Sequence, residues 1–210
     1  MMLSPVPAEQ LDTMFDVLDR ALAPWPGAQS AFQRIADTRI LNPGFTHDLQ
    51  MGHNKAVDLA RQLGMSTCDE APCQSFSWDG HAVRIQTETA VLLHEIAHWQ
   101  IAPVYRHVLP DFGLGAGPET GRAADANAAC CVDNATKEEE ESLASLLGIL
   151  WEVELGGPAV LAFCEQNWLE LYDRPGTARH FASIFETLLG RGLIKPDSRP
   201  NPDCCLNAAV

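Results

Sequence analysis

Hydrophobic residues recur along much of this chain at the three-to-four-residue spacing of amphipathic helices. The pattern begins over residues 8–23, where Leu11, Phe15 and Leu22 fall on one helix face before a Pro-Trp-Pro-Gly stretch at 24–27 ends it. The same reasoning predicts further helices over residues 54–63, 136–155, 158–172 and 177–189. Most of the regular structure is therefore expected to be helical.

Two of these helices carry signals at their first residues. Thr136 and Glu139 match the capping box, in which the N-cap hydroxyl and a carboxylate three residues later satisfy each other's backbone N–H groups. Pro158 suits the first position of the next helix, where its fixed φ is favourable. We therefore expect the first of these helices to begin with Thr136 as its N-cap, and the second to begin at Pro158.

A single region favours β-structure. Residues 76–78 and 82–85 are short runs that contain aromatic or branched side chains, and they predict one or two short strands. The fold class expected is mainly α (α+β), with a small β element. With 210 residues, 46% of them hydrophobic, the chain has enough material for one core. We expect a single domain over residues 1–195 and an irregular, proline-rich tail over 196–210.

Two histidines and a glutamate interrupt the apolar run of residues 91–101. His94, Glu95 and His98 form an H-E-x-x-H motif. On an α-helix, residues i and i+4 share a face, so both imidazoles can bind one divalent metal while Glu95 reaches the metal-bound water. Polar side chains are costly to bury alone, and a metal ion supplies their partner. The motif predicts a zincin-like metal helix, and a chance pattern of core histidines is the alternative.

Net charge and cysteine content limit the classes of binding partner and the cellular compartment that we expect for this protein. The formal net charge is -14, which argues against nucleic acid or an anionic membrane, since both need a basic face. A lysine-bearing protein substrate fits better. No stretch is long and uncharged enough to span a bilayer, and no signal peptide precedes the first helix. Seven cysteines, an odd number, do not suggest a secreted disulfide framework, so we expect a cytoplasmic protein.

The connection after the motif helix, residues 103–134, is long and rich in glycine. Connections of this size in compact domains are usually functional or disordered, and glycine lets a backbone approach a ligand. This one contains Asp111 within a D-F-G sequence and Arg122 at the end of P-E-T-G-R. We expect a functional loop, with Asp111 and Arg122 as substrate-binding candidates; Asp111 as a turn cap and Arg122 as a solvated side chain are the alternatives.

The motif's two histidines leave the metal's coordination shell incomplete. The third histidine of the metzincin motif is absent, because position 104 is Val. The acids of residues 138–141 are the obvious donors of a third ligand, although acids in a first helical turn commonly face water. The leucine stripe of this helix lies closest to Glu139 and Glu140, whereas Glu141 shares its face with the small residues Ser145 and Gly148. A small-residue face permits close helix packing, so periodicity leaves all three open.

The type of metal is equally open from the ligands alone. With Zn(II), two histidines and a carboxylate form a hydrolase site in which Glu95 takes a proton from metal-bound water. With Fe(II), the same ligands form the site of non-haem iron oxygenases, which leaves positions for dioxygen and substrate.

The sequence H-E-I-A-H-W-Q-I-A at 94–102, followed by D-F-G at 111–113, Pro118 and G-R at 121–122, resembles the elongation factor P hydroxylases. That family has a glutamate at the head of the next helix, upstream of a Leu, Leu, Val, Gly, Pro pattern that matches residues 147–158 here. The resemblance covers about a third of the chain. Departures occur at 114–116, where Leu-Gly-Ala replaces the family's aromatic residues, in a longer loop after Arg122, and at 143–146.

The resemblance implies that Glu141 is the third ligand, beside His94 and His98, in a metal-dependent catalytic domain. It also implies an Fe(II) monooxygenase that hydroxylates the β-lysylated lysine of elongation factor P. In this hypothesis Glu95 relays protons, and Asp111 and Arg122 shape the substrate mouth. The alternatives are a Zn(II) metallopeptidase that uses the same ligands, with Glu95 as general base, and a non-catalytic scaffold whose metal is structural.

Overall fold

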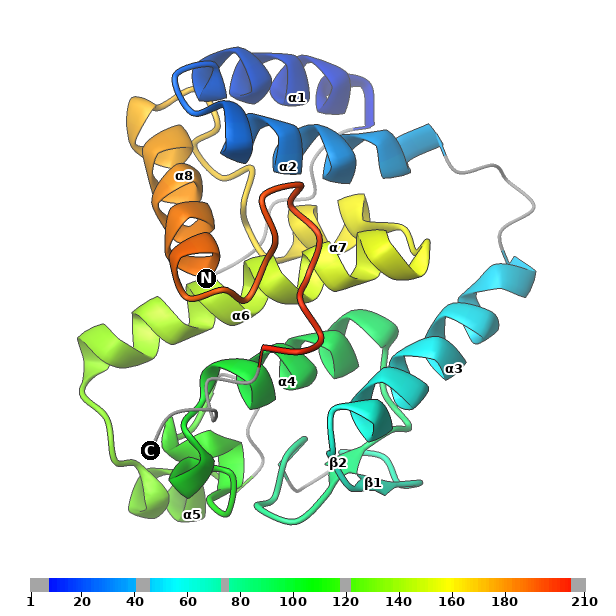
Figure 1. Cartoon of the computed structure of the whole chain (residues 1–210), viewed down its shortest axis with the longest axis vertical. Coiled ribbons are helices and arrows are strands. Elements are labelled where there is room, and N and C mark those ends of the chain that lie inside the picture. The colour runs from blue at the N-terminus through cyan, green and yellow to red at the C-terminus, as the bar shows by residue number, and fades with distance from the viewer. Residues whose placement is uncertain (1–7, 41–45, 73–75, 118–121, 205–210) are drawn as a thin grey trace.

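Helix α6 occupies the middle of the molecule and separates two groups of elements (Figure 1). The computed structural model describes residues 8–40, 46–72, 76–117 and 122–204. These residues form α1 (Ala8–Leu22), α2 (Pro26–Asp37), α3 (Thr46–Gln62), α4 (Thr89–Ile101), α5 (Ala123–Ala129), α6 (Asn134–Leu155), α7 (Ala159–Glu165) and α8 (Pro175–Gly190). Short 3-10 turns occur at Thr38–Ile40, Val104–Arg106 and Pro110–Gly113. The expectation of a mainly α fold is confirmed.

On one side of α6 lie α1, α2, α7 and α8, and on the other side lies α4, the helix of the H-E-x-x-H motif (Figure 1). The first group packs through phenylalanine rings: Phe15 stacks on Phe32 with centroids 5.2 Å apart, and Phe163 lies within 6.1 Å of both and of Phe181. Burying such rings is the main driving force for this half of the core. Helix α6 thereby gains a fixed position against which α4 can pack.

The contact between α4 and α6 is the most extensive of any two elements in the described part of the chain. At Gly148 the helices come so close that a Cβ atom there would lie 3.2 Å from the backbone of Leu93 and from the amide nitrogen of His94. Because these neighbours are backbone atoms, any side chain at this position would push the two helices apart by a few tenths of an ångström, so the close approach favours glycine where α6 crosses the start of the motif. This confirms that the small-residue face of α6 packs against the motif helix.

The β element is smaller than the predicted strands. β1 (Thr67–Cys68) pairs in parallel with β2 (Val83–Arg84), and Trp78 adds a single antiparallel bridge to Val83. The predicted strand at 76–78 thus contributes one bridged residue. In this sheet β1 contacts helix α3, and β2 contacts the motif helix α4.

Several helix limits differ from the sequence expectation. The Pro-Trp-Pro-Gly stretch ends α1 as expected, but Pro26 then begins α2, because proline at the first helical position costs no hydrogen bond. Helix α3 begins eight residues earlier than expected, at Thr46. Helix α7 ends at Glu165 instead of residue 172, since Asn167 and Leu171 adopt positive φ values of 64° and 55°.

Both predicted helix starts were wrong by a short distance. Asp133, not Thr136, is the N-cap of α6, and its carboxylate accepts a hydrogen bond from the Thr136 backbone N–H at 2.8 Å. Pro158 is the N-cap of α7, not its first residue. The long connection after α4 also contains a helix, α5, that the sequence pattern did not indicate.

The segment after Lys195 forms turns, and its Pro200 makes an isolated antiparallel bridge back to Ile194. It nevertheless packs on the motif helix (Figure 1), because the Gln100 side-chain amide donates to the carbonyls of Asn201 and Cys204 at 3.2 and 3.3 Å. The Gln100 carbonyl in turn accepts from the Trp151 indole at 2.7 Å. No helix in the described ranges is long and apolar enough to cross a membrane.

Replacing Gly148 by valine should reduce the free energy of unfolding by about 1–3 kcal/mol, because the added side chain would force α4 and α6 apart. Urea denaturation measures the change. Gly176→Val is the matched control: Gly176 also lies in a helix but has no atom within 4 Å of its Cβ position, so a change within about 0.5 kcal/mol is expected. Equal stability of Gly148→Val and the wild type would contradict the close approach.

Glu152 gives a second test, of the core's response to pH. It is 5% exposed, its Oε2 has no partner among the described residues, and burial, with a contribution from Glu165, raises its pKa from 4.5 to about 7. The folded state then binds the proton more tightly than the unfolded chain, so stability is full below about pH 4.5 and falls as pH rises towards 7.

Glu152→Gln should remove this loss. Relative to wild type, the variant is expected to be more stable by about 3 kcal/mol at pH 8 and nearly unchanged at pH 4.5, measured by urea denaturation at both values. Glu186→Gln, in which an exposed carboxyl is replaced, is the control. A constant difference between Glu152→Gln and wild type across this range would show that Glu152 ionises normally in the folded protein.

Candidate metal centre

Helix α4 presents two imidazoles one turn apart on its α6-facing side. The Nε2 atoms of His94 and His98 are 3.0 Å apart, and the rings meet edge to face with centroids 4.6 Å apart. His98 is only 4% exposed, while the His94 side chain is 24% exposed. The pair therefore lies at the edge of the core with one side open, as a metal site with an exchangeable position requires.

The third group comes from α6. The Oε2 atom of Glu141 lies 3.2 Å from His94 Nε2 and 3.5 Å from His98 Nε2. One donor atom from each of the three residues lies within 4.8 Å of the others. Metal–ligand bonds of about 2.0–2.2 Å place neighbouring donors at such separations, so the three side chains fit a divalent metal. Of the acids that the sequence left open, the structure brings Glu141 to the histidines.

The neighbouring acids make different contacts. Glu139 pairs with Arg191 at 2.7 Å on the surface, where both side chains are at least 35% exposed. Glu140 is buried and pairs with Arg106, whose side chain is 1% exposed. Glu138 is exposed. Consecutive residues on a helix point about 100° apart, so each acid in this turn reaches a different surrounding, and only Glu141 meets the imidazoles.

The electrostatics of the three groups favour a bound cation. Burial alone would raise the pKa of Glu141, but its hydrogen bonds to His94 and His98 outweigh burial and hold that pKa well below its ordinary range. Burial lowers the pKa of His94, whereas for His98 the hydrogen bond and charge of Glu141 outweigh burial and raise the pKa. The carboxylate thus stays ionised at the centre of the group, which is the state that a metal ligand needs.

Glu95 lies beside this centre and has an unusual ionisation. Burial, assisted by the nearby charges of Asp111 and Glu141, raises its pKa from 4.5 to about 7, although His98 and a hydrogen bond with the Ser77 hydroxyl act in the opposite direction. A carboxyl group that titrates near neutral pH can both accept and donate a proton. Its position next to the histidine pair matches the role that the motif predicts.

The D-F-G sequence forms a strained turn that covers one histidine. Asp111 and Phe112 have φ values of 45° and 51°, conformations that residues other than glycine rarely adopt. The Phe112 ring stacks on Trp78 at 5.4 Å and on His98 at 5.7 Å, and the Asp111 backbone N–H donates to the Trp78 carbonyl at 3.0 Å. The turn places the Asp111 charge near enough to Glu95 to help raise the pKa of that carboxyl group.

Arg122 lies farther from the chemistry than its sequence position suggested. Its exposed guanidinium pairs with Asp125 and lies 5.7 Å above the Phe76 ring. No contact joins it to His94, His98 or Glu141 in the part of the chain that the structure describes. Pro118 and Gly121, which complete the resemblance in this loop, lie outside the described residues.

Two residues with partners at or next to the site were not identified from the sequence. Ser77, expected only as part of a strand, hydrogen-bonds to Glu95. Arg106 follows the motif helix and pairs with Glu140. No local pattern marks either one, because each meets its partner through tertiary packing; an arginine among the apolar residues of 103–109 was the single available signal.

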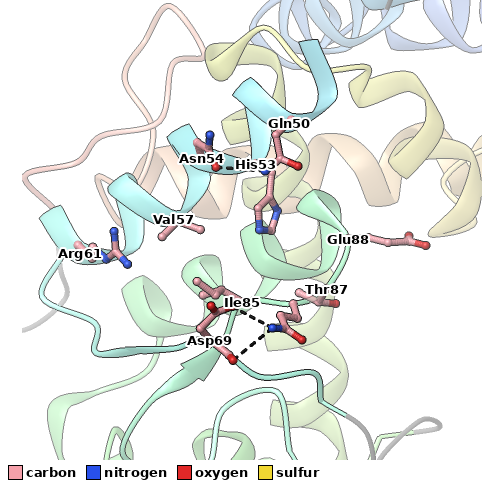
Figure 2. A pocket seen from close by; sticks show the side chains of 10 residues that line it. Gln50, His53, Asn54, Val57, Arg61, Asp69, Ile85, Thr87 and Glu88 are labelled. Atoms are coloured by element: carbon pink, nitrogen blue, oxygen red, sulfur yellow. Dashed lines mark hydrogen bonds between the residues drawn. The ribbon is translucent and has the colours of Figure 1, made fainter. Parts of the chain in front are cut away.

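A separate hollow of about 730 Å³ lies between α3 and the residues that lead into α4 (Figure 2). His53 extends from α3 into it, Asp69 lies at its base and Glu88 at its edge. The side-chain amide of Gln86, another lining residue, donates to the Asp69 carboxylate at 3.1 Å. None of the three candidate metal ligands lines this hollow. The metal centre, formed by α4 and α6, is therefore a site distinct from this hollow.

Comparison with protein families, curated proteins and solved structures finds no match to this chain. The chemistry of the site must therefore be argued from its own residues.

A divalent metal should stabilise the protein through these three side chains. A metal that binds only the folded state, at a free concentration of about 100 times its Kd, raises the free energy of unfolding by about 2.7 kcal/mol. Thermal unfolding with and without Zn(II) or Co(II) measures this gain, and excess chelator should reverse it. Glu141→Gln should lose most of the gain and Glu139→Gln should keep it. The same gain in both variants would exclude Glu141 as a ligand.

Proposed function

We propose that this protein is a non-haem iron-dependent monooxygenase that hydroxylates a modified lysine side chain of a protein substrate, as the elongation factor P hydroxylases do. The observation that carries the proposal is the convergence of His94, His98 and Glu141 on one point with His94 partly exposed. Two histidines and one carboxylate, with an open side, are the ligand set of non-haem Fe(II) oxygenases. The resemblance of residues 94–122 to that family supports the choice of iron.

Bound Fe(II) would supply the activation of dioxygen at this site. The chain's own residues would then hold the ion, exclude water and move protons. Glu95, with a pKa near 7, is suited to exchange a proton beside the open position. Phe112 and Trp78 cover the His98 side and keep bulk solvent from it.

The electrostatics also support a cationic substrate. The charges of Asp111 and Glu141 both act on Glu95, and the chain carries a formal net charge of -14. Such a site attracts an ammonium group and repels phosphate. A lysine of elongation factor P that carries β-lysine offers two such amines, which is why we propose this substrate class. Five free cysteines among the described residues are compatible with a proposed cytoplasmic location.

A zinc metallopeptidase is the second candidate. It is favoured by the position of Glu95, whose raised pKa next to the two histidines suits a general base that takes a proton from water. The proximity of a small sheet to the motif helix is also compatible with the zincin arrangement. The two candidates share every ligand and differ in the metal and the second reactant.

Anaerobic purification followed by metal analysis separates them. The proposal expects that Fe(II)-loaded protein, with an added two-electron reductant and β-lysylated elongation factor P, consumes one dioxygen per hydroxylated lysine. One oxygen atom enters the substrate and the other leaves as water, so mass spectrometry should show a gain of one oxygen. Full zinc occupancy with no oxygen consumption would reject the hydroxylase, and peptide cleavage by that zinc form would favour the peptidase.

Glu95→Gln tests whether the centre is catalytic. The variant should keep metal affinity but lose turnover by about 10²–10⁴-fold, because the amide cannot exchange the proton. Turnover and metal content are measured on the same preparation. Glu139→Gln, which alters an exposed carboxyl two residues before Glu141 on a different face of α6, is the control and should remain active. Unchanged turnover in Glu95→Gln would show that Glu95 does not exchange the proton in the reaction.

A further inference from the structure

A buried ion pair lies directly beside the candidate ligand Glu141. Arg106, at the end of the Val104–Arg106 turn that follows α4, is 1% exposed, and its Nη2 donates to Oε2 of Glu140. Glu140 is the residue immediately before Glu141 on α6. The pair therefore joins the segment that leaves the motif helix to the helical turn that supplies the third ligand.

The arginine's backbone is firmly held. The indole of Trp78 donates to the carbonyl of His107 at 2.9 Å, and the His107 ring stacks on Trp99 at 3.8 Å. The Arg106 backbone N–H also donates to the Pro103 carbonyl at 2.8 Å. These contacts tie the arginine to the aromatic side chains that cover His98. The anchor for Glu140 thus belongs to the same rigid group as the histidine ligand.

The ion pair is poorly explained by stability alone. Nε and Nη1 of Arg106 have no partner among the described residues, although both are buried. Removing two charges from water costs several kcal/mol per ion, and an apolar pair of similar volume is often equally stable. An incompletely satisfied ion pair of this kind is better explained by the geometry that it imposes on its surroundings.

That geometry is the rotation of α6 about its axis. The approach at Gly148 sets the distance between α4 and α6 two helical turns away. The first turn of α6 is held by the Asp133 cap and by hydrogen bonds from Lys137 Nζ to the carbonyls of Gly115 and Ala116 at 3.3 and 2.7 Å. Of the two ion pairs in this turn, Arg106–Glu140 is the buried one. Fixing Glu140 to Arg106 sets the direction of Glu140, and Glu141 then points about 100° further round, towards His94 and His98. If the first turn of α6 rotated about the helix axis by the angle between two residues, about 100°, the Glu141 carboxylate would no longer face the histidines.

We propose that Arg106 and Glu140 are positioning residues that orient Glu141 as a metal ligand; the inference rests on the proposed metal function of His94, His98 and Glu141. The pair acts through Glu141 and need not touch the metal. It confers metal affinity and coordination geometry, in the manner of the outer groups that orient ligands in many metal sites.

The test compares two double variants that differ in which ion pair of the same helical turn they remove. Arg106→Met with Glu140→Met removes the buried pair without leaving a lone buried charge. Glu139→Met with Arg191→Met removes the exposed pair and is the matched control. Circular dichroism and thermal unfolding of the metal-free proteins establish that each one folds.

Metal affinity is measured by chelator competition with Co(II), and the visible absorption of bound Co(II) reports its coordination geometry. The buried-pair variant is expected to bind about 10–100-fold more weakly and to show an altered Co(II) spectrum. The control variant should keep the wild-type affinity and spectrum. A change in stability alone would leave the Co(II) spectrum of the buried-pair variant unchanged. It would also leave the Co(II) affinity of this variant equal to that of the control variant.

Arg106→Lys supplies a second measurement in case the buried-pair variant does not fold. Lysine keeps a cation opposite Glu140 but lacks the planar guanidinium, so affinity should fall by about 3–10-fold with a smaller spectral change. Wild-type affinity and spectrum in whichever variant folds would overturn the positioning role while leaving the proposed function intact. If the wild-type protein binds no metal at one ion per chain, both proposals are wrong.

Discussion

The close packing of α6 on α4 is the constraint on which the rest of the structure depends. Gly148 allows the two backbones to approach at the start of the H-E-x-x-H motif, and no larger residue fits there without displacement of the backbone. The phenylalanine cluster on the opposite side of α6 holds that helix in place. The histidines of one helix and the carboxylate of the other can meet only because this distance is fixed.

The start of α6 illustrates how one turn of like charges is divided among several environments. Four successive acids would repel one another if they shared a surface, but helical geometry points them in different directions. Glu139 reaches the surface cation Arg191, Glu140 the buried Arg106, and Glu141 the two histidines. Each of these three acids is stabilised by a different positive partner or donor, and Glu141 becomes available to a metal.

Helices α4 and α6 form one side of the candidate metal centre, and loops form the other. The strained D-F-G turn stacks Phe112 on His98 and brings the charge of Asp111 towards Glu95, while Ser77 approaches the same carboxylate from beside the small sheet. Strain of this kind persists only where the surrounding contacts determine it, and it is concentrated at functional sites. The acidic, partly dry surroundings explain why Glu95 ionises near neutral pH.

The sequence by itself determined the helical class of the fold and the pairing of His94 with His98, because helix periodicity and an i, i+4 spacing are local properties of the chain. It did not choose among Glu139, Glu140 and Glu141, since that choice depends on how α6 is rotated against α4. Helix α2 was missed because Pro26 both ends one pattern and begins the next. The pairing of Arg106 with Glu140 was likewise decided by the tertiary structure, because residues 34 positions apart meet through the packing of helices and not through their spacing in the sequence.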